Sequence, residues 1–254
     1  MHLIDSHCHL NELSRMREIE ETIKKAEENN VKTIISNSVD LNSMKKNIEL
    51  QEKFSSVKCA LGIHPSNILK MNEKEINEGI KFIEKNISKA IALGEIGLDF
   101  RHAETQEQKE KQRRIFQELI ELGNKKRKAL IVHSRYAGKN CLEMLEEKKS
   151  EKVLMHWFTN SIKEIQKAVE LNYFISVGPS ILNSIETQKI VKEIPMEFLL
   201  LETDCPVKFN GIPSEPFWIK EVAEKLSELK EISVEELTEQ AFKNAVNFFE
   251  TGLK

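Results

Sequence analysis

The chain begins with an apolar run that ends in two histidines, since residues 3–9 read Leu-Ile-Asp-Ser-His-Cys-His. If this run is a β-strand, its side chains alternate between two faces, so His7 and His9 point the same way. One strand can then place two imidazole nitrogens on one metal ion. The run therefore predicts a strand over Leu3–His7 whose carboxyl end carries part of a metal site.

Seven further short apolar runs follow, and amphipathic, charged segments lie between them. The predicted strands are Leu3–His7, Thr33–Ser36, Val57–Ile63, Ile91–Glu95, Leu130–His133, Val153–His156, Tyr173–Val177 and Leu199–Glu202. The predicted helices include Arg17–Asn29, Glu73–Asn86, Glu107–Leu122, Ile162–Leu171 and Phe217–Leu229. This alternation implies parallel strands joined by right-handed crossovers. Eight such units in 254 residues predict an α/β fold, a closed (β/α)8 TIM barrel that forms a single domain over residues 1–254.

One extra helix is predicted at the C-terminal end, over Val234–Phe249. Ser233 and Glu236 give its start the pattern of a capping box, and Ser161 and Glu164 repeat that pattern before another predicted helix. The extra helix carries an apolar face that we expect to seal the barrel wall. That face consists of Leu237, Ala241, Ala245 and Phe248.

Composition narrows the class of protein. The formal net charge of −3 gives no general attraction to polyanions, and the basic run Lys125–Lys128 is interpreted as a solvated helix end. The four cysteines are scattered without a CxxC pair, which favours a reducing compartment, and Cys8 and Cys205 are expected to be buried against helices. A strand that starts at residue 3 leaves no room for a signal peptide, and no apolar run reaches membrane-spanning length. We therefore predict a cytoplasmic protein with no membrane association.

Ionisable side chains stand at the ends of the predicted strands. A TIM barrel gathers the carboxyl ends of its strands at one mouth, where active sites lie. A lone histidine is more often a hydrogen-bonded core residue, but five of the seven histidines stand at strand ends, and only His2 and His102 do not. His2 is predicted to be exposed and His102 to lie in a loop. The joint pattern predicts metal ligands at this mouth: His7, His9, Glu95, His133, His156 and Asp204.

These six residues are more than the three protein ligands that a catalytic zinc ion normally has. Two divalent ions that share a carboxylate use the set better, although one ion with the surplus residues around it remains an alternative. Alternation also places Asp5 on the face of His7 and Glu202 on the face of Asp204. Either carboxylate is expected to orient a ligating imidazole or, alternatively, to be polar filling of the barrel.

With these residues assembled, the chain resembles the TatD family of metal-dependent deoxyribonucleases, within the amidohydrolase-like barrels. The stretches that carry the resemblance are Asp5–Leu10, Gly62–Pro65, Gly94–Asp99, His133–Arg135, His156–Phe158 and Leu201–Pro206. The resemblance implies one ion held by His7, His9, Glu95 and Asp204, and a second held by Glu95, His133 and His156. It also implies that Glu95 bridges the ions and that Asp204 takes a proton from the attacking water.

Two further residues receive roles from this resemblance. His64 would contact the substrate phosphate, and Arg135 would assist with its permanently charged, forked donors. The alternatives are that His64 caps the loop before Pro65 and that Arg135 pairs with a loop carboxylate.

At some positions the sequence differs from the residues that are most common in the family, which leaves substrate preference open. These are Asn11, Phe100, Trp157 and the loop 206–213, which lacks an arginine-bearing segment. Trp157 or Phe158 could stack on a nucleobase, or pack in the core, and alternation turns at least one of them toward the helices.

The main hypothesis is hydrolysis of phosphodiester bonds from the 3′ end of single-stranded DNA. Two divalent ions (Mg, Mn or Zn) would activate the water, with Asp204 as general base and Glu95 as the bridging catalytic carboxylate. The alternatives keep the site and change the substrate to a carboxyl ester or amide, for example in aminoacyl-tRNA deacylation, or to another phosphoester. A non-enzymatic binding protein on this scaffold is a third possibility. No obligate protein partner is predicted.

Overall fold

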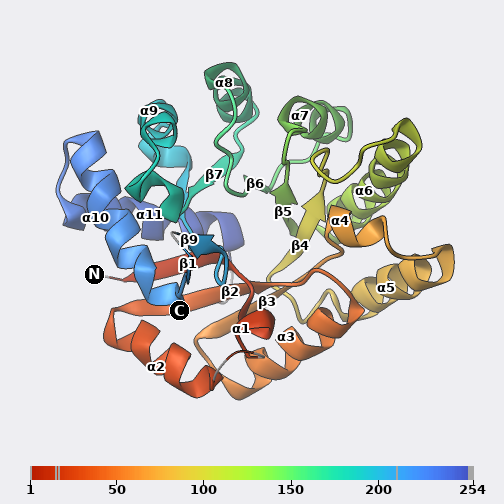
Figure 1. Cartoon of the computed structure of the whole chain (residues 1–254), viewed down its shortest axis with the longest axis horizontal. Coiled ribbons are helices and arrows are strands. Elements are labelled where there is room, and N and C mark those ends of the chain that lie inside the picture. Colours follow the sequence, from red (N-terminus) through yellow and green to blue (C-terminus); the bar gives the residue numbers. More distant parts are fainter. Residues whose placement is uncertain (1, 15, 17, 210, 251–254) are drawn as a thin grey trace.

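Eight parallel strands in chain order form a barrel with helices around it in the computed structural model (Figure 1). The structure describes residues 2–14, 16, 18–209 and 211–250. The strands are β1 (Leu3–Cys8), β2 (Val31–Asn37), β3 (Val57–Leu61), β4 (Ala92–Gly97), β5 (Ala129–His133), β6 (Val153–Met155), β7 (Phe174–Val177) and β8 (Leu199–Leu201). The predicted TIM-barrel fold is confirmed, with strand bounds that differ from the predicted ones by a few residues.

The helices form the outer wall. They are α1 (Leu10–Leu13), α2 (Ile19–Glu28), α3 (Leu41–Lys53), α4 (Pro65–Ile68), α5 (Glu73–Asn86), α6 (Gln106–Lys126), α7 (Gly138–Glu147), α8 (Ile162–Glu170), α9 (Ile185–Lys192), α10 (Ile219–Lys230) and α11 (Val234–Phe249). Helices α5 and α11 have the predicted bounds. Arg17, the predicted start of α2, lies outside the described residues. The Ser161–Glu164 capping box is present, and Ser233 caps α11 through the N–H of Glu236.

The barrel is nearly closed by three hydrogen bonds at its seam rather than by a regular ladder between the described parts of β8 and β1. The N–H of Asp204 donates to the carbonyl of His7 at 2.8 Å, and the N–H of His9 donates to the carbonyl of Cys205 at 2.7 Å. The hydroxyl of Ser6 donates to the carbonyl of Leu201 at 2.8 Å. These bonds join the two ends of the sheet at its carboxyl edge.

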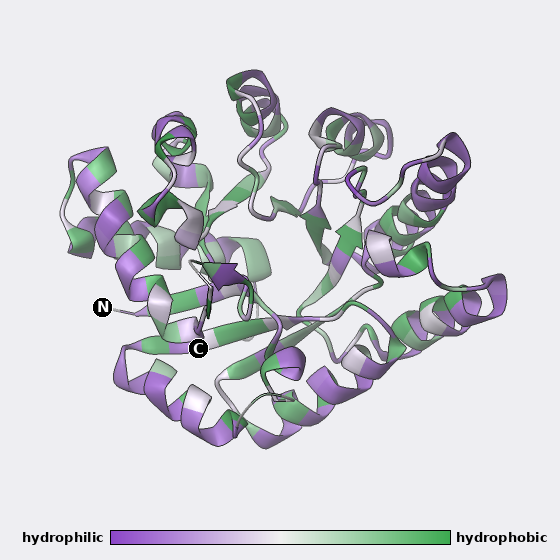
Figure 2. Ribbon diagram, in the orientation of Figure 1, coloured by the Kyte–Doolittle hydropathy of each residue, from purple (hydrophilic) through white to green (hydrophobic). Residues whose placement is uncertain are grey.

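Two apolar clusters hold the barrel together. The inner cluster takes side chains from every strand, including Ile4, Ala92 and Ile131, and the outer cluster lies between strands and helices. Green hydrophobic faces of the helices turn toward the strands, and purple hydrophilic faces turn outward (Figure 2). Phe248 and Phe249 of α11 join the inner cluster, so this helix closes one end of the barrel. The predicted apolar face of α11 is buried throughout.

The four cysteines are all buried free thiols. Cys8 and Cys205 belong to the outer cluster, as predicted from alternation. None of the described helices combines the length and apolar character needed to cross a lipid bilayer.

Irregular register in two strands decides which side chains reach the mouth. In β1, Ile4 faces the barrel interior, yet Cys8 faces outward, because the pairing with β2 shifts between Asp5 and Cys8. Strict alternation from Ile4 would have turned His7 outward. A similar shift between Leu93 and Ile96 lies in β4. Irregularities of this kind re-aim side chains beside active sites.

Two glycines make room for this backbone. A Cβ at Gly62 would lie 2.5 Å from the carbonyl oxygen of Glu95, and a Cβ at Gly97 would lie 2.0 Å from that of His133. Gly97 also has a φ of +140°, which L side chains rarely adopt. Both glycines therefore allow β4 to approach its neighbours closely at the level of the ionisable residues.

We expect Gly97→Ala to destabilise the protein by more than about 3 kcal/mol, because it adds a backbone clash to an unfavourable φ. Gly211→Ala is the matched control, since Gly211 also has a positive φ (+81°) but open space around it. The control should lose only about 1 kcal/mol. Urea denaturation of both variants measures the difference, and equal losses would contradict the role given to crowding.

Candidate metal centre

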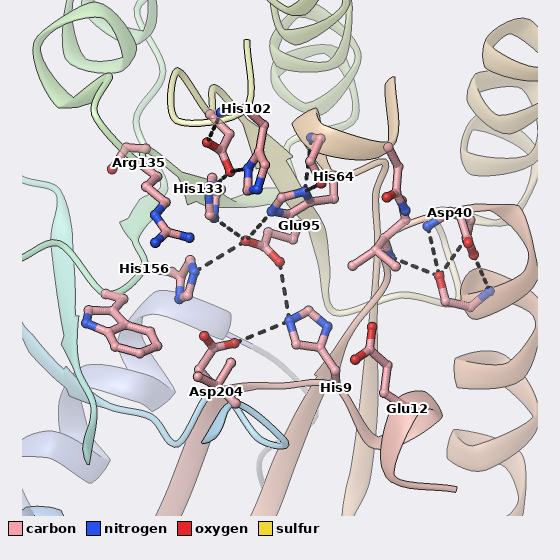
Figure 3. Close-up of a pocket in the computed structure, with 18 of the residues that line it drawn as sticks. His9, Glu12, Asp40, His64, Glu95, His102, His133, Arg135, His156 and Asp204 are labelled. Carbon is pink, nitrogen blue, oxygen red and sulfur yellow. Dashed lines mark hydrogen bonds and ion pairs between the residues drawn. The ribbon is translucent and has the colours of Figure 1, made fainter. Parts of the chain in front are cut away.

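The six predicted ligands come together at the carboxyl mouth of the barrel. Five of them line a cavity of about 780 Å³, and the sixth, His7, lies fully buried at its base. Figure 3 shows side chains from opposite sides of the barrel pointing toward the Glu95 carboxylate. Glu95 itself is 2 % exposed. The residues at this centre thus belong to five separate strands or strand ends.

Four atoms lie close together: Nε2 of His7, Nε2 of His9, Oε2 of Glu95 and Oδ1 of Asp204. The two nitrogens are 3.3 Å apart. His7 Nε2 lies 3.5 Å from both oxygens, and His9 Nε2 lies 3.4 and 3.3 Å from them. Ligand atoms about 2.0–2.1 Å from a tetrahedral zinc-like ion lie about 3.3–3.4 Å from one another. These five distances are near this value, so the two imidazoles could share one cation with these carboxylates.

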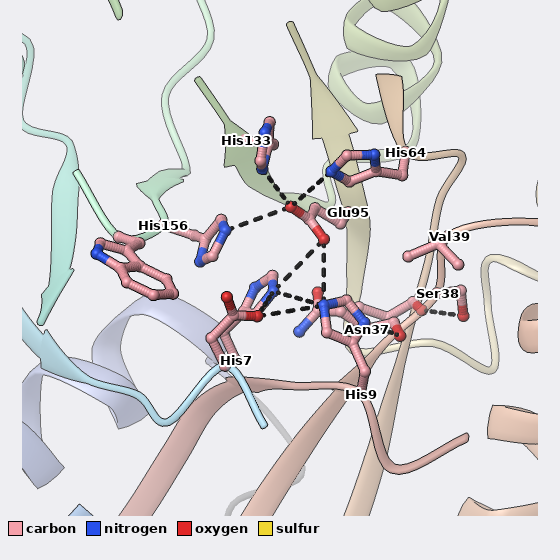
Figure 4. Close-up of polar contacts among 12 residues, drawn as sticks. His7, His9, Asn37, Ser38, Val39, His64, Glu95, His133 and His156 are labelled. Atoms are coloured by element: carbon pink, nitrogen blue, oxygen red, sulfur yellow. Dashed lines mark hydrogen bonds and ion pairs between the residues drawn. The ribbon is translucent and has the colours of Figure 1, made fainter. Parts of the chain in front are cut away.

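Three imidazoles surround the other oxygen of the same carboxylate. Oε1 of Glu95 lies 2.7 Å from Nδ1 of His133, 3.3 Å from Nε2 of His156 and 3.6 Å from Nε2 of His64. Figure 4 shows Glu95 at the centre of these contacts. This second set is less regular than the first, since its shortest contact is a hydrogen bond. Glu95 joins the two sets through its two oxygens.

The outward ring nitrogens of three imidazoles have acceptors. His9 Nδ1 lies 3.2 Å from the carbonyl of Asn37, and His156 Nδ1 lies 3.2 Å from Oε2 of Glu202. His133 Nε2 lies 3.2 Å from Oδ2 of Asp99. An acceptor at one ring nitrogen fixes the proton there and leaves the lone pair of the other nitrogen for a cation. The contact predicted for Glu202 with an imidazole is therefore present.

Asp99 is a residue of the site that the sequence reasoning did not single out. It is 1 % exposed and accepts hydrogen bonds from the backbone N–H groups of Arg101 and His102. Its Oδ2 lies 2.8 Å from Nδ1 of His102. Its position four residues after Glu95, in the stretch Gly94–Asp99, was the available signal. His102, predicted to be a loop residue, lies in a turn with a half-exposed ring.

Of the two roles expected for Asp5, contact with a ligating imidazole is not found among the described residues. Its carboxylate accepts hydrogen bonds from the backbone N–H of Thr203 at 2.9 Å, from the hydroxyl of Thr203 and from the backbone N–H of His7. It does not reach the His7 ring, whose Nδ1 has no partner among the described residues. The register shift between Asp5 and Cys8 is the cause, because it places the two side chains on different faces. Asp5 instead ties β1 to the segment after β8.

His64 lies beside the buried Glu95 carboxylate, whereas Arg135 is exposed. His64 caps α4, where its Nδ1 accepts the N–H of Ser66 at 3.1 Å. The ring proton is then on Nε2, which faces Glu95, so His64 is suited to donate a hydrogen bond rather than to ligate a cation. Arg135 is exposed at the cavity rim, and no carboxylate among the described residues pairs with it. The predicted pairing of Arg135 with a loop carboxylate is absent from that part of the chain.

Burial and mutual contacts shift the pKa values of these groups in opposite directions. Burial lowers the pKa of His9 and of His156, but contacts of His9 with Asp204 and Glu95, and of His156 with Glu202 and Glu95, outweigh burial and raise both pKa values well above the usual range. Burial, helped by the charges of His133 and His9, outweighs the opposing effect of Glu95 and lowers the pKa of His64 to about 3. Burial opposes ionisation of Glu95, yet the imidazoles hold its pKa well below the usual range.

The cavity as a whole is acidic. Its lining includes the carboxylates of Glu12, Asp40, Glu95, Asp99 and Asp204. Arg135 is the one guanidinium or ammonium among the described lining residues. With neutral imidazoles, four negative charges are unbalanced. Divalent cations would offset this excess of negative charge. Without them, the carboxylates would repel the phosphate groups of a substrate.

Of the two aromatic residues that follow β6, one packs in the core and the other lines the cavity. Phe158 is fully buried in the outer cluster, as alternation predicted for at least one of the two residues. Trp157 is half-buried and lines the cavity, and it stacks on Phe209 of the short strand β9 (Lys208–Phe209). Strand β9 pairs with β10 (Ile212–Pro213) in the loop that sequence analysis singled out.

Comparison with known proteins identifies the family of the chain. The model of the TatD related DNase family matches residues 4–250. The chain belongs to the TatD family. Deoxyribonuclease TATDN3 of Homo sapiens is 34% identical over 258 residues, which cover 97% of this chain and 94% of that protein. The uncharacterized metal-dependent hydrolase YabD of Bacillus subtilis is 32% identical over 255 residues, which cover 97% of this chain and 98% of that protein.

Solved structures of TatD proteins have the same fold. The crystal structure of YJJV, a TatD homolog from Escherichia coli, superposes with a TM-score of 0.88 at 25% identity and covers 98% of both chains. The chain is accordingly a metal-dependent hydrolase of the TatD deoxyribonuclease family.

Substitutions around Glu95 should weaken metal binding in a graded way. Glu95→Gln removes the charge shared by both sets and should cost more than about 100-fold in affinity for Mn²⁺ or Zn²⁺. Asp99→Asn, which reaches the ligand set only through the outer nitrogen of His133, should cost about 10–100-fold. Glu78→Gln, an exposed position of α5 outside the cavity lining, is the matched control and should leave affinity unchanged. Isothermal titration calorimetry gives the order, and equal affinity of Glu95→Gln and Glu78→Gln would refute the assignment.

Metal affinity should rise with pH. Because the pKa values of His9 and His156 are raised, both imidazoles carry a proton at neutral pH in the metal-free protein, and a cation must displace it. Binding should therefore release protons, and acidification should weaken it. Titrations in two buffers of different ionisation enthalpy measure this release, and identical heats in both buffers would argue against it.

Proposed function

We propose that this chain is a 3′–5′ exonuclease that hydrolyses phosphodiester bonds at the 3′ end of single-stranded DNA. The observation that carries this proposal is the Glu95 carboxylate, which contacts His7 and His9 through one oxygen and a second cluster of imidazoles through the other, at the mouth of the cavity. Divalent ions bound there would lower the pKa of a water molecule and offset the charge that develops on the phosphate.

Two ions fit the charge of the cavity better than one. The lining carries four unbalanced negative charges when its imidazoles are neutral, and two divalent cations would bring it to neutrality. His7, His9, Glu95 and Asp204 would hold the first ion. Glu95, His133 and His156 would hold the second. Mg, Mn and Zn are all compatible with this mixture of nitrogen and oxygen ligands.

Asp204 is suited to be the general base. Burial raises its pKa, but the neighbouring imidazoles outweigh burial and lower the pKa, so the carboxylate is ionised at neutral pH. Its Oδ1 contacts His7 and His9, which leaves Oδ2 to accept a proton. Its backbone has a φ of +48°, and strained conformations of this kind collect at functional sites.

His64 and Arg135 would hold the phosphate. Nε2–H of His64 lies beside the Glu95 carboxylate, where it could donate to a non-bridging oxygen. Arg135 stands at the rim with its guanidinium directed toward His133 and His156 (Figure 3). Both groups would stabilise negative charge without taking part in proton transfer. The enclosed mouth of the barrel suits a single-strand terminus better than an intact duplex.

Asp204→Asn should abolish cleavage because an amide cannot accept the proton, while its oxygen can still approach a cation. We expect a fall in kcat of at least about 10²–10⁴-fold on a single strand labelled at its 5′ end, with metal stoichiometry of two retained in calorimetry. The wild-type protein should shorten this strand from its 3′ end one nucleotide at a time.

Undiminished cleavage by the variant would contradict the role of Asp204. A 3′-terminal phosphorothioate should block the wild-type ladder, whereas internal cuts would indicate an endonuclease. Turnover of a carboxyl ester without cleavage of DNA would favour the alternative substrate class.

A further inference from the structure

Two aromatic side chains and one cation follow neighbouring strands on one side of the cavity. Arg135 and Tyr136 come after β5, and Trp157 comes after β6, which pairs with β5. All three line the cavity beside His133 and His156. The aromatic surface is therefore adjacent to the site where the proposed function places the scissile phosphate.

Neighbouring aromatic rings hold the indole of Trp157 in place. Phe209 stacks on the indole with centroids 5.5 Å apart and an angle of 28° between planes, and the His156 ring meets it edge-on at 6.5 Å. Phe209 in turn contacts Trp218 at 6.4 Å. These contacts support one face of the indole, which leaves the part that lines the cavity available to another flat ring.

Tyr136 is exposed for 73% of its surface and has a φ of +55°. The left-handed backbone costs about 1–2 kcal/mol in a residue with a Cβ, and the exposed ring gains nothing from burial in the core. Its exposure at the cavity rim next to Arg135 gives this ring a place where a second base could stack.

The distribution of charged side chains around the cavity favours binding of a polyanion on this side. Glu12 and Asp40, which follow β1 and β2, give the other side two carboxylates. None of the cavity-lining residues between positions 134 and 160 is acidic, and Arg135 is among them. A strand with a charge on every phosphate would be repelled on the β1–β2 side and attracted on the β5–β6 side.

We propose that single-stranded DNA leaves the catalytic mouth across the β5–β6 side, with the bases next to the cleaved bond stacked on Trp157 and Tyr136 and a neighbouring phosphate against Arg135. This inference rests on the proposed function and adds the subsite that recognises a polynucleotide. Stacking on aromatic rings tolerates every base, so the subsite should accept single strands without sequence preference.

The test compares two substrates and matched variants of the full-length, metal-loaded protein. The substrates are a short oligodeoxythymidylate and a strand of the same length that is abasic next to the cleaved linkage. Trp157→Leu and Tyr136→Leu remove a ring, whereas Trp157→Phe and Tyr136→Phe keep one. Ile185→Ala, which changes an exposed apolar side chain of α9 that does not line the cavity, is the control.

Each Leu variant should raise KM for oligodeoxythymidylate about 5- to 150-fold, with kcat and metal content unchanged. Neither should change KM for the abasic strand, and the Phe variants should recover most of the wild-type KM. The exposed position of Tyr136 keeps the test valid if Trp157→Leu does not fold. Unchanged KM, or equal losses on both strands, would overturn the subsite. Absence of cleavage of both strands by the wild type would instead overturn the proposed function.

Discussion

Closure of the barrel between β8 and β1 is the constraint on which the metal centre depends. The hydrogen bonds from Asp204 to His7 and from His9 to Cys205 join the sheet at the level of the ligands. The same backbone segments that close the barrel therefore carry His7, His9 and Asp204, three of the four residues of the first ligand set. Asp5 strengthens this seam through Thr203. Any rearrangement that opened the seam would separate the ligands.

The remaining ligand atom belongs to Glu95, which lies across the barrel from the seam. Because this carboxylate is buried, its negative charge must be stabilised by neighbouring groups. The carboxylate of Glu95 is almost without solvent, so its charge is stabilised by imidazoles and not by water. Those imidazoles cannot all be protonated at once, since the stacked rings of His7 and His156 lie 3.7 Å apart. Burial lowers the pKa of His7, and the charge of His156 lowers it further. A divalent cation resolves this conflict because it offsets the carboxylates without adding protons.

The cavity above the centre has two chemically different sides. The β1–β2 side carries carboxylates, and the β5–β6 side carries a guanidinium with two aromatic rings. A barrel mouth built from eight separate loops can vary one side without disturbing the ligands on the strand ends. Trp157, one of the positions at which the sequence is expected to differ from its family, lies in one of those loops. The proposed metal ligands and the proposed base-stacking residues thus belong to different parts of the fold.

The sequence alone determined the strand–helix alternation, the barrel and the identity of the six ionisable residues, because periodicity and strand ends are local properties of the chain. It could not determine which face His7 and Asp5 occupy, since that depends on a register shift set by pairing with β2. The stretch Gly94–Asp99 contained a signal that pointed to Asp99, but the contact of this residue with His133 appears only when β5 places that ring beside it. The tertiary structure alone decided these matters because they depend on contacts between segments far apart in the chain, which no local pattern encodes.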